Sequence, residues 1–303
     1  MEVLKGVLKR LLAMLSLGYV LYFYSEVMFW ARWKPGDTLL SQAVTWLVYS
    51  LLAFFVLLLS ERYRAEGVDS VFLIGAVFGW LVEGVVVQTA YVAFPFQLVW
   101  TPLAWHALIT VLLGFYFAGK ALGEWELKKS GAFFALMGAF WGFWASYWKL
   151  EDGYAFLPWD FALYAFAGTA ILAVAYLSLA SLSGDEFKPT RGEFVLYGAF
   201  LSVFAAVTFA MVPFAPAVLV PLLAIALYSL GRLKGEGSFV RRYPTINPRR
   251  LFLLFLMPLS ALLTYLPLMD VWIEVNLPVA LATSSAGIVL FLKAVYNGLR
   301  KRH

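Results

Sequence analysis

The sequence predicts an all-α protein: a polytopic transmembrane helix bundle of about ten helices, with both termini on the cytoplasmic side. Three observations lead to this prediction. Hydrophobic residues make up 63% of the 303-residue chain and charged residues only 14%, whereas soluble domains carry about 25% charged residues. Apolar segments of about 20 residues, the length that crosses a bilayer, recur along the whole chain. Basic residues gather on alternate connections between these segments.

Ten apolar segments are predicted to span the membrane. Pro213 and Pro216 separate two of them and predict a tight helical hairpin, and Pro258 with Pro267 predicts a kinked or short ninth helix. The first segment contains Glu26 and is too long for a signal peptide, so we predict an uncleaved helix. The predicted spans are residues 11–31, 39–60, 70–94, 101–121, 130–149, 158–182, 193–212, 215–231, 251–269 and 277–297.

The distribution of Lys and Arg sets the predicted orientation. With the N-terminus inside, 20 basic residues, Arg302 among them, fall on the cytoplasmic side and 3 fall outside, as the positive-inside rule requires. We therefore expect a single transmembrane domain, residues 1–303, in the plasma membrane. Its longest loop, residues 232–250, is expected to lie in the cytoplasm, where its six basic residues would face the anionic leaflet.

Tryptophan is expected near the outer interface, because its ring is apolar and its N–H is polar. An anchoring belt is the simpler interpretation, and an aromatic wall around an outward-facing pocket is the alternative. The eight residues concerned are Trp30, Trp33, Trp100, Trp105, Trp144, Trp148, Trp159 and Trp272.

Composition also excludes several kinds of chemistry. The chain has no Cys, which excludes disulfides, thiolate catalysis and Cys-based metal sites. Its two His residues, His106 and His303, exclude a three-His zinc site within one chain. We expect no metal, no cofactor and no nucleic-acid partner; membrane lipids and a small-molecule or lipid substrate are the expected partners. Asn and Gln total six residues, which is compatible with a thermophilic source.

Ionisable residues inside the predicted spans are the candidate functional residues, because such groups are costly in lipid and usually face a bundle interior. They are Glu26 in the first span, Glu83 in the third, His106 in the fourth and Asp160 near the start of the sixth. Simpler interpretations exist for two of them. Glu26 could reach the interface beside Trp30, and Asp160 could cap its helix.

The third and fourth spans are expected to form a hairpin around the apolar segment 94–102. Gln88 follows Glu83 by about one and a half turns. One stripe of the fourth span carries residues at four-residue steps, namely Pro102, His106, Thr110 and Gly114. We therefore predict that Glu83, Gln88, His106 and Thr110 meet across the hairpin. A purely structural Glu–His pair is the alternative.

In the fifth span, Gly138, Gly142 and Ser146 follow one another at four-residue steps. Small residues at this spacing are typical of close helix contact in membranes. We predict a packing face here.

Three functions remain open. In a proton- or cation-coupled carrier of a small solute, which is slightly favoured, Glu83 would bind the ion, His106 would tune it, and Glu26, Gln88, Thr110 and Asp160 would line the site. In a membrane-embedded enzyme acting on a neutral lipid or isoprenoid group, Glu83 and His106 would be general acid and base. A non-catalytic assembly subunit would need no site. A polar path to the inner face favours the carrier, and a blind pocket favours the enzyme.

Overall fold

The computed structural model describes residues 2–153 and 155–301, so Arg302 and His303 lie outside the described residues. The described chain is 78% helical and forms no strand. Its longer helices, in chain order, are α1 (Glu2–Tyr22), α3 (Leu39–Arg62), α4 (Val68–Leu81), η4 (Trp100–Phe117), α7 (Leu127–Ala145), α9 (Pro158–Ser181), α10 (Arg191–Met211), α11 (Ala215–Arg232), α12 (Leu256–Leu268) and α13 (Asn276–Arg300).

Shorter helices extend or connect these elements. η1 (Phe23–Val27) and α2 (Met28–Trp30) continue α1, and η2 (Val82–Val86) continues α4. α5 (Gln97–Val99) and α6 (Ala118–Gly123) extend η4 at its two ends, and the 3₁₀ helix η5 (Pro248–Phe255) leads into α12. The remaining two, η3 (Thr89–Tyr91) and α8 (Trp148–Asp152), lie in connections.

Nine helices among the described residues are long and apolar enough to cross a membrane, so the chain has the character of a multi-pass membrane protein. The predicted count of ten is not confirmed. A helix does form at the predicted fifth span, but Lys128 and Lys129 lie in the first turn of α7 and shorten its apolar stretch. The hairpin predicted around Pro213 is present as α10 and α11.

The centre of the bundle is the pair formed by α4 and η4. Their backbones approach closely because two residues of α4 lack a side chain: a Cβ at Gly75 would press on the backbone of Ala107, and one at Gly79 would overlap Pro102. α1 packs against α3, α9 and η4, while α13 covers the other side of η4. This arrangement places the polar residues of the first, third and fourth predicted spans in one interior.

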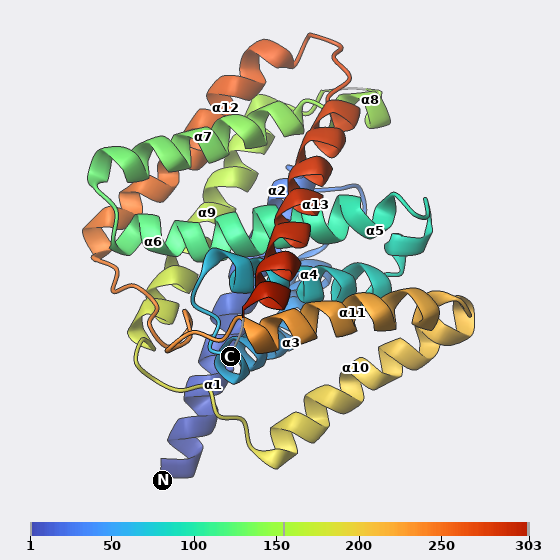
Figure 1. Cartoon of the computed structure of the whole chain (residues 1–303). Coiled ribbons are helices and arrows are strands. Elements are labelled where there is room, and N and C mark those ends of the chain that lie inside the picture. The colour runs from blue at the N-terminus through green and yellow to red at the C-terminus, as the bar shows by residue number, and fades with distance from the viewer. Residues whose placement is uncertain (1, 154, 302–303) are drawn as a thin grey trace.

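The chain direction defines two ends of the bundle. We call the end that holds the first turns of α1 and the segment 233–247 the basic end. The opposite end holds the connection 31–38 and the starts of η4 and α9 (Figure 1).

Two helix pairs lie at opposite edges of the bundle in Figure 1. At one edge, α7 packs on α12, and Gly138 and Gly142 face the carbonyl groups of Met257 and Ala261. The predicted packing face is therefore correct for both glycines, whereas the Ser146 hydroxyl bonds within its own helix to Phe143.

At the other edge, α10 forms a hairpin with α11 (Figure 1) and has one buried residue, Thr208. The Thr208 hydroxyl donates a hydrogen bond to the carbonyl of Val85, 2.7 Å away, in the π-helical end of α4.

For four of the eight tryptophans, burial contradicts the prediction of an anchoring belt at the membrane interface. Trp33, Trp159 and Trp272 are exposed, but Trp100, Trp105, Trp144 and Trp148 are buried. The buried rings pack on one another and around Phe29, whose carbonyl accepts hydrogen bonds from the indoles of Trp144 and Trp148 at 2.6 and 2.8 Å. We call this group the tryptophan cluster. The cluster therefore packs around α2, which continues α1, and its four rings are interior residues rather than surface anchors.

We predict that Gly142→Leu destabilises the protein by about 1–3 kcal/mol, because the new side chain would collide with the Ala261 carbonyl and separate α7 from α12. The measurement is the free energy of unfolding in detergent. Gly198→Leu on α10 is the matched control, because a Cβ there meets open space. Equal losses in the two variants would contradict the packing role.

Candidate functional site

Glu83 and His106 meet in the interior of the bundle. The His106 Nε2 atom lies 2.6 Å from a Glu83 carboxylate oxygen. Both residues are buried: 8% of the surface of Glu83 and 3% of that of His106 are exposed. The contact joins the π-helical end of α4 to the π-helix η4. The central contact proposed from the sequence is therefore present in the structure.

His106 continues the network toward the first helix. Its Nδ1 atom lies 2.9 Å from the hydroxyl oxygen of Ser25, and that oxygen lies 3.0 Å from the hydroxyl of Thr110. Ser25 comes from η1, so residues about eighty positions apart share one hydrogen-bonded chain. All four side chains, Ser25, Glu83, His106 and Thr110, are buried.

A threonine completes the hydrogen bonding of the carboxylate. The Thr89 hydroxyl, in the turn after α4, donates to the second oxygen of Glu83. The buried Thr101 hydroxyl has no hydrogen-bond partner. The Glu83 carboxylate therefore has polar partners on both oxygens, as a buried carboxylate requires.

All the helix segments that carry this network depart from α-helical geometry. Ser25 lies in η1, Glu83 in η2, and both His106 and Thr110 in η4, and each of these is π-helical. A π-helix makes i→i+5 hydrogen bonds and is frequent at functional sites. Three such segments converge here, which marks this interior as different from an ordinary packed helix contact.

The direction of the hydrogen bonds depends on the charge of His106. In a neutral ring, Nε2–H donates to Glu83, so Nδ1 accepts from the Ser25 hydroxyl and Ser25 accepts from Thr110. In a protonated ring, Nδ1–H donates to Ser25, and Ser25 then donates to Thr110. A proton added to the pair therefore reverses the orientation of two hydroxyl groups without moving a heavy atom.

Glu26 forms a second, neighbouring cluster. One of its carboxylate oxygens accepts from the Tyr49 hydroxyl at 2.7 Å and the other from the Trp30 indole at 2.9 Å. The same carboxylate lines a cavity of about 70 Å³ at the opposite end of the bundle, together with Lys34 and Asp37. Glu26 follows Ser25 directly, so this polar cavity adjoins the buried network.

Two predicted site residues lie apart from the network. Gln88 occupies a left-handed turn at the end of η2, with φ of 64°, and the network's hydrogen bonds do not include its side chain. Asp160 is exposed on the first turn of α9, where it lines an open groove with Arg32 and Tyr164. No hydrogen bond among the described residues joins Gln88 to Glu83 or His106, because the chain turns at Gln88 and ends the helix there, so a place for Gln88 in the site stays a prediction.

Sequence reasoning missed Ser25, Thr89 and Tyr49 as partners of the charged groups. Ser25 had one signal, its position next to Glu26 in an apolar span, but nothing in the sequence shows which face of the first helix meets the fourth. Thr89 was missed because it lies beyond the end of a regular helix.

Among the described residues, no group of three or more His, Asp or Glu side chains is arranged to hold a metal ion. The network instead consists of groups that exchange protons: a carboxylate, an imidazole and hydroxyls. Such an arrangement can accept, hold and pass on a proton.

Comparisons with protein-family models, with curated proteins and with solved structures find no match to this chain.

We predict that Glu83 and His106 stabilise the fold jointly, with a coupling energy above about 1 kcal/mol in a double-mutant cycle of Glu83→Gln and His106→Gln. The reason is that each substitution alone leaves a buried partner with altered hydrogen bonding. Free energies of unfolding in mixed detergent micelles give the cycle.

A second cycle, Glu26→Gln with His106→Gln, is the control, because Glu26 bonds to Tyr49 and Trp30 instead. Coupling that is no larger in the first cycle than in the second would argue against a specific Glu83–His106 interaction.

Proposed function

We propose that this integral membrane protein is a proton-coupled carrier of a small polar solute, in which Glu83 and His106 form the proton-binding unit. The observation that carries the proposal is the buried chain of proton-exchanging groups, Glu83–His106–Ser25–Thr110. Chains of carboxylate and His side chains serve as proton relays in pumps and carriers. The direct contact of Glu83 and His106 also weighs against an assembly subunit, which would need no such site.

Proton binding would change the charge of the interior. A carboxylate and a neutral imidazole carry one negative charge together, and one added proton makes the pair neutral overall. Because a net charge in a lipid-embedded interior is costly, the protonated and deprotonated proteins should prefer different packings. A solute that also prefers one of these packings is then coupled to the proton by linkage.

The polar cavity beside Glu26 is the solute site in this proposal. It presents two carboxylates, Glu26 and Asp37, and one ammonium group, Lys34, which lies 3.8 Å from the centre of the Trp30 ring. Its volume of about 70 Å³ suits a solute of a few non-hydrogen atoms. A small solute that carries an amine or several hydrogen-bond donors matches this lining best.

The orientation and location are also part of the proposal. The 20-to-3 division of basic residues supports a cytoplasmic basic end under the positive-inside rule. On this basis, we assign the protein to the plasma membrane, with residues 232–250 against the inner leaflet.

We predict that a rapid pH change at a supported membrane containing the protein gives a transient charge-displacement current, and that Glu83→Gln abolishes it, because an amide cannot bind the proton. Asp160→Asn is the matched control: it removes an exposed carboxylate outside the network and should leave the current unchanged. A wild-type protein that gives no current, or a Glu83→Gln variant that gives the full current, would contradict the proposal.

One observation favours a second candidate, a membrane-embedded hydrolase. Ser25, His106 and Glu83 follow one another in the order hydroxyl, imidazole, carboxylate, which is the order of a nucleophile, its general base and the group that orients the base. The Ser25 hydroxyl would attack an ester of a lipid, His106 would take its proton, and the proton would then pass to the leaving alcohol. The Ser25 side chain is buried, however, and also bonds to Thr110.

The two candidates differ in their dependence on Ser25. We predict that a lipophilic fluorophosphonate, which labels activated serines, leaves the protein unlabelled, and that Ser25→Ala retains the charge-displacement current at reduced speed. Mass spectrometry of the treated protein is the measurement, with Ser60→Ala as the control, because the Ser60 hydroxyl bonds to its own helix. Labelling that depends on Ser25 would establish the hydrolase and overturn the carrier.

A further inference from the structure

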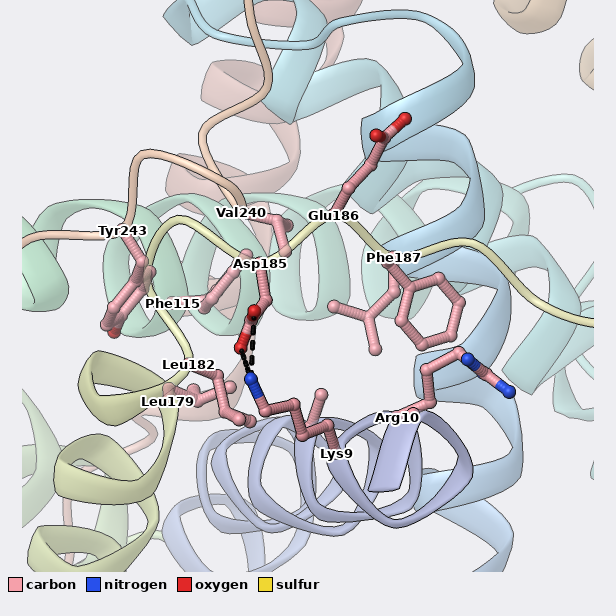
Figure 2. Close-up of a pocket in the computed structure, with 13 residues that line it drawn as sticks. Lys9, Arg10, Phe115, Leu179, Leu182, Asp185, Glu186, Phe187, Val240 and Tyr243 are labelled. Carbon is pink, nitrogen blue, oxygen red and sulfur yellow. Dashed lines mark hydrogen bonds and ion pairs between the residues drawn. The ribbon is translucent and has the colours of Figure 1, made fainter. Parts of the chain in front are cut away.

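A cavity of about 180 Å³ opens at the basic end of the bundle, against the first turns of α1. An ion pair stands at its mouth: the Lys9 ammonium lies 2.9 Å from the Asp185 carboxylate (Figure 2). Both side chains are well exposed to water. Apolar side chains such as Phe115 line the deeper part. Phe115 directly follows Gly114, which places the cavity beside the polar stripe of η4.

Three buried tyrosines lie between this cavity and the Glu83–His106 pair. Tyr243 lines the cavity, with its ring stacked on Phe115 at 5.5 Å. The hydroxyl oxygens of Tyr24 and Tyr176 lie 3.1 Å apart beside Gly114, and the Tyr243 hydroxyl lies beside Gly119, five residues further along the same span. Tyr24 also precedes Ser25, which belongs to the buried network.

The helix η4 and its continuation α6 supply an acceptor and space for these tyrosines. The Tyr176 hydroxyl donates to the carbonyl of Gly114, one turn beyond Thr110. Gly114 leaves room for the ring of Tyr24, and Gly119 leaves room for the hydroxyl of Tyr243. Any larger residue at either glycine would collide with a tyrosine. The stripe of η4 that starts at His106 therefore continues as a line of phenol groups toward the basic end.

One hydroxyl on this line is not satisfied. The Tyr243 oxygen is buried and has no hydrogen-bond partner, although a buried polar group without a partner is costly. A water molecule between this oxygen and the Tyr24–Tyr176 pair would satisfy it and join the three phenols.

We propose that Tyr24, Tyr176 and Tyr243 form a proton path between the cavity at the basic end and the Glu83–His106 pair. This inference rests on the proposed function. It adds the half of the proton route on the cytoplasmic side, which is the polar path to the inner face that a carrier needs. Each hydroxyl accepts a proton on its oxygen and passes its own proton to the next oxygen, with water in the gaps. The tyrosines end unchanged, and nothing is oxidised or reduced.

Four charged side chains line the cavity, namely Lys9, Arg10, Asp185 and Glu186, and Arg10 also pairs with Glu193. At the cavity, Asp185 with Lys9 collects or releases the proton. At the end of the path within the bundle, the proton reaches Thr110 and Ser25 and then His106 and Glu83. Glu26 and Tyr49 lie beyond Ser25, toward the opposite end, and belong to the other half of the route.

The test follows the protonation of Glu83 from each side separately. The protein is inserted in one orientation into vesicles of phosphatidylcholine and phosphatidylglycerol. A caged proton is released by light either inside or outside, and infrared spectroscopy records the bands of the Glu83–His106 pair that change on protonation and that Glu83→Gln removes. We expect Tyr176→Phe to slow protonation from the basic end about tenfold or more, and to leave protonation from the opposite end unchanged. Tyr243→Phe should act in the same direction.

Tyr19→Phe is the matched control. The Tyr19 hydroxyl is also buried and also donates to a glycine carbonyl, that of Gly168 at 3.1 Å, but Tyr19 lies outside the path. Its rates should equal those of the wild type from both sides.

The outcomes separate this inference from the proposed function. If both Tyr176→Phe and Tyr243→Phe protonate Glu83 from the basic end at the wild-type rate, the tyrosine path is overturned while the proton-binding pair stands. If they slow protonation equally from both ends, a general structural effect replaces the path. If the wild-type Glu83 does not take up a proton from either side, the proposed function itself fails.

Discussion

The cost of burying polar groups where lipid is the solvent is the constraint on which the rest of this structure depends. Glu83 and His106 lie in the interior of an apolar bundle, and each has partners on the atoms that need them. Backbone groups at membrane depth obey the same rule. Side chains bond to carbonyl groups of the π-helical segments: Val85 accepts from Thr208, and Gly114 accepts from Tyr176. The distorted helices and the polar network therefore support each other.

Close packing supplies the second condition, because a hydrogen bond between helices forms only if their backbones approach. Gly75 and Gly79 of α4 provide that approach to η4. The tryptophan cluster fixes the end of α1 by occupying the Phe29 carbonyl with two indole groups, which in turn fixes where Ser25 faces. The small residues and the large aromatic residues thus act together to place one hydroxyl beside one imidazole ring.

Much of the architecture could be predicted from the sequence, because apolar length and charge are local properties of the chain. The α10–α11 hairpin, the glycine face of α7 and the pairing of Glu83 with His106 followed from spacing and composition. Other features depend on tertiary contact. Ser25 could not be assigned to His106 without the rotation of the first helix. The burial of Trp105 and Trp144 could not be separated from an interfacial position, because both roles favour the same residue near a helix end. The π-helical geometry has no periodic signal in the sequence. The left-handed turn at Gln88, which ends the helix that carries Glu83, could therefore not be predicted.

The hydrogen bond from Thr208 to Val85 has a mechanical consequence. α10 faces outward along nearly its whole length, and Thr208 is its one buried residue. Its single buried tether ends on the helical segment that carries Glu83. In a bilayer, a helix so exposed takes its tilt from the thickness and lateral pressure of the surrounding lipid. A change in that tilt would act through this tether on the backbone beside the Glu83 carboxylate, which would link the thickness of the membrane to this buried acid.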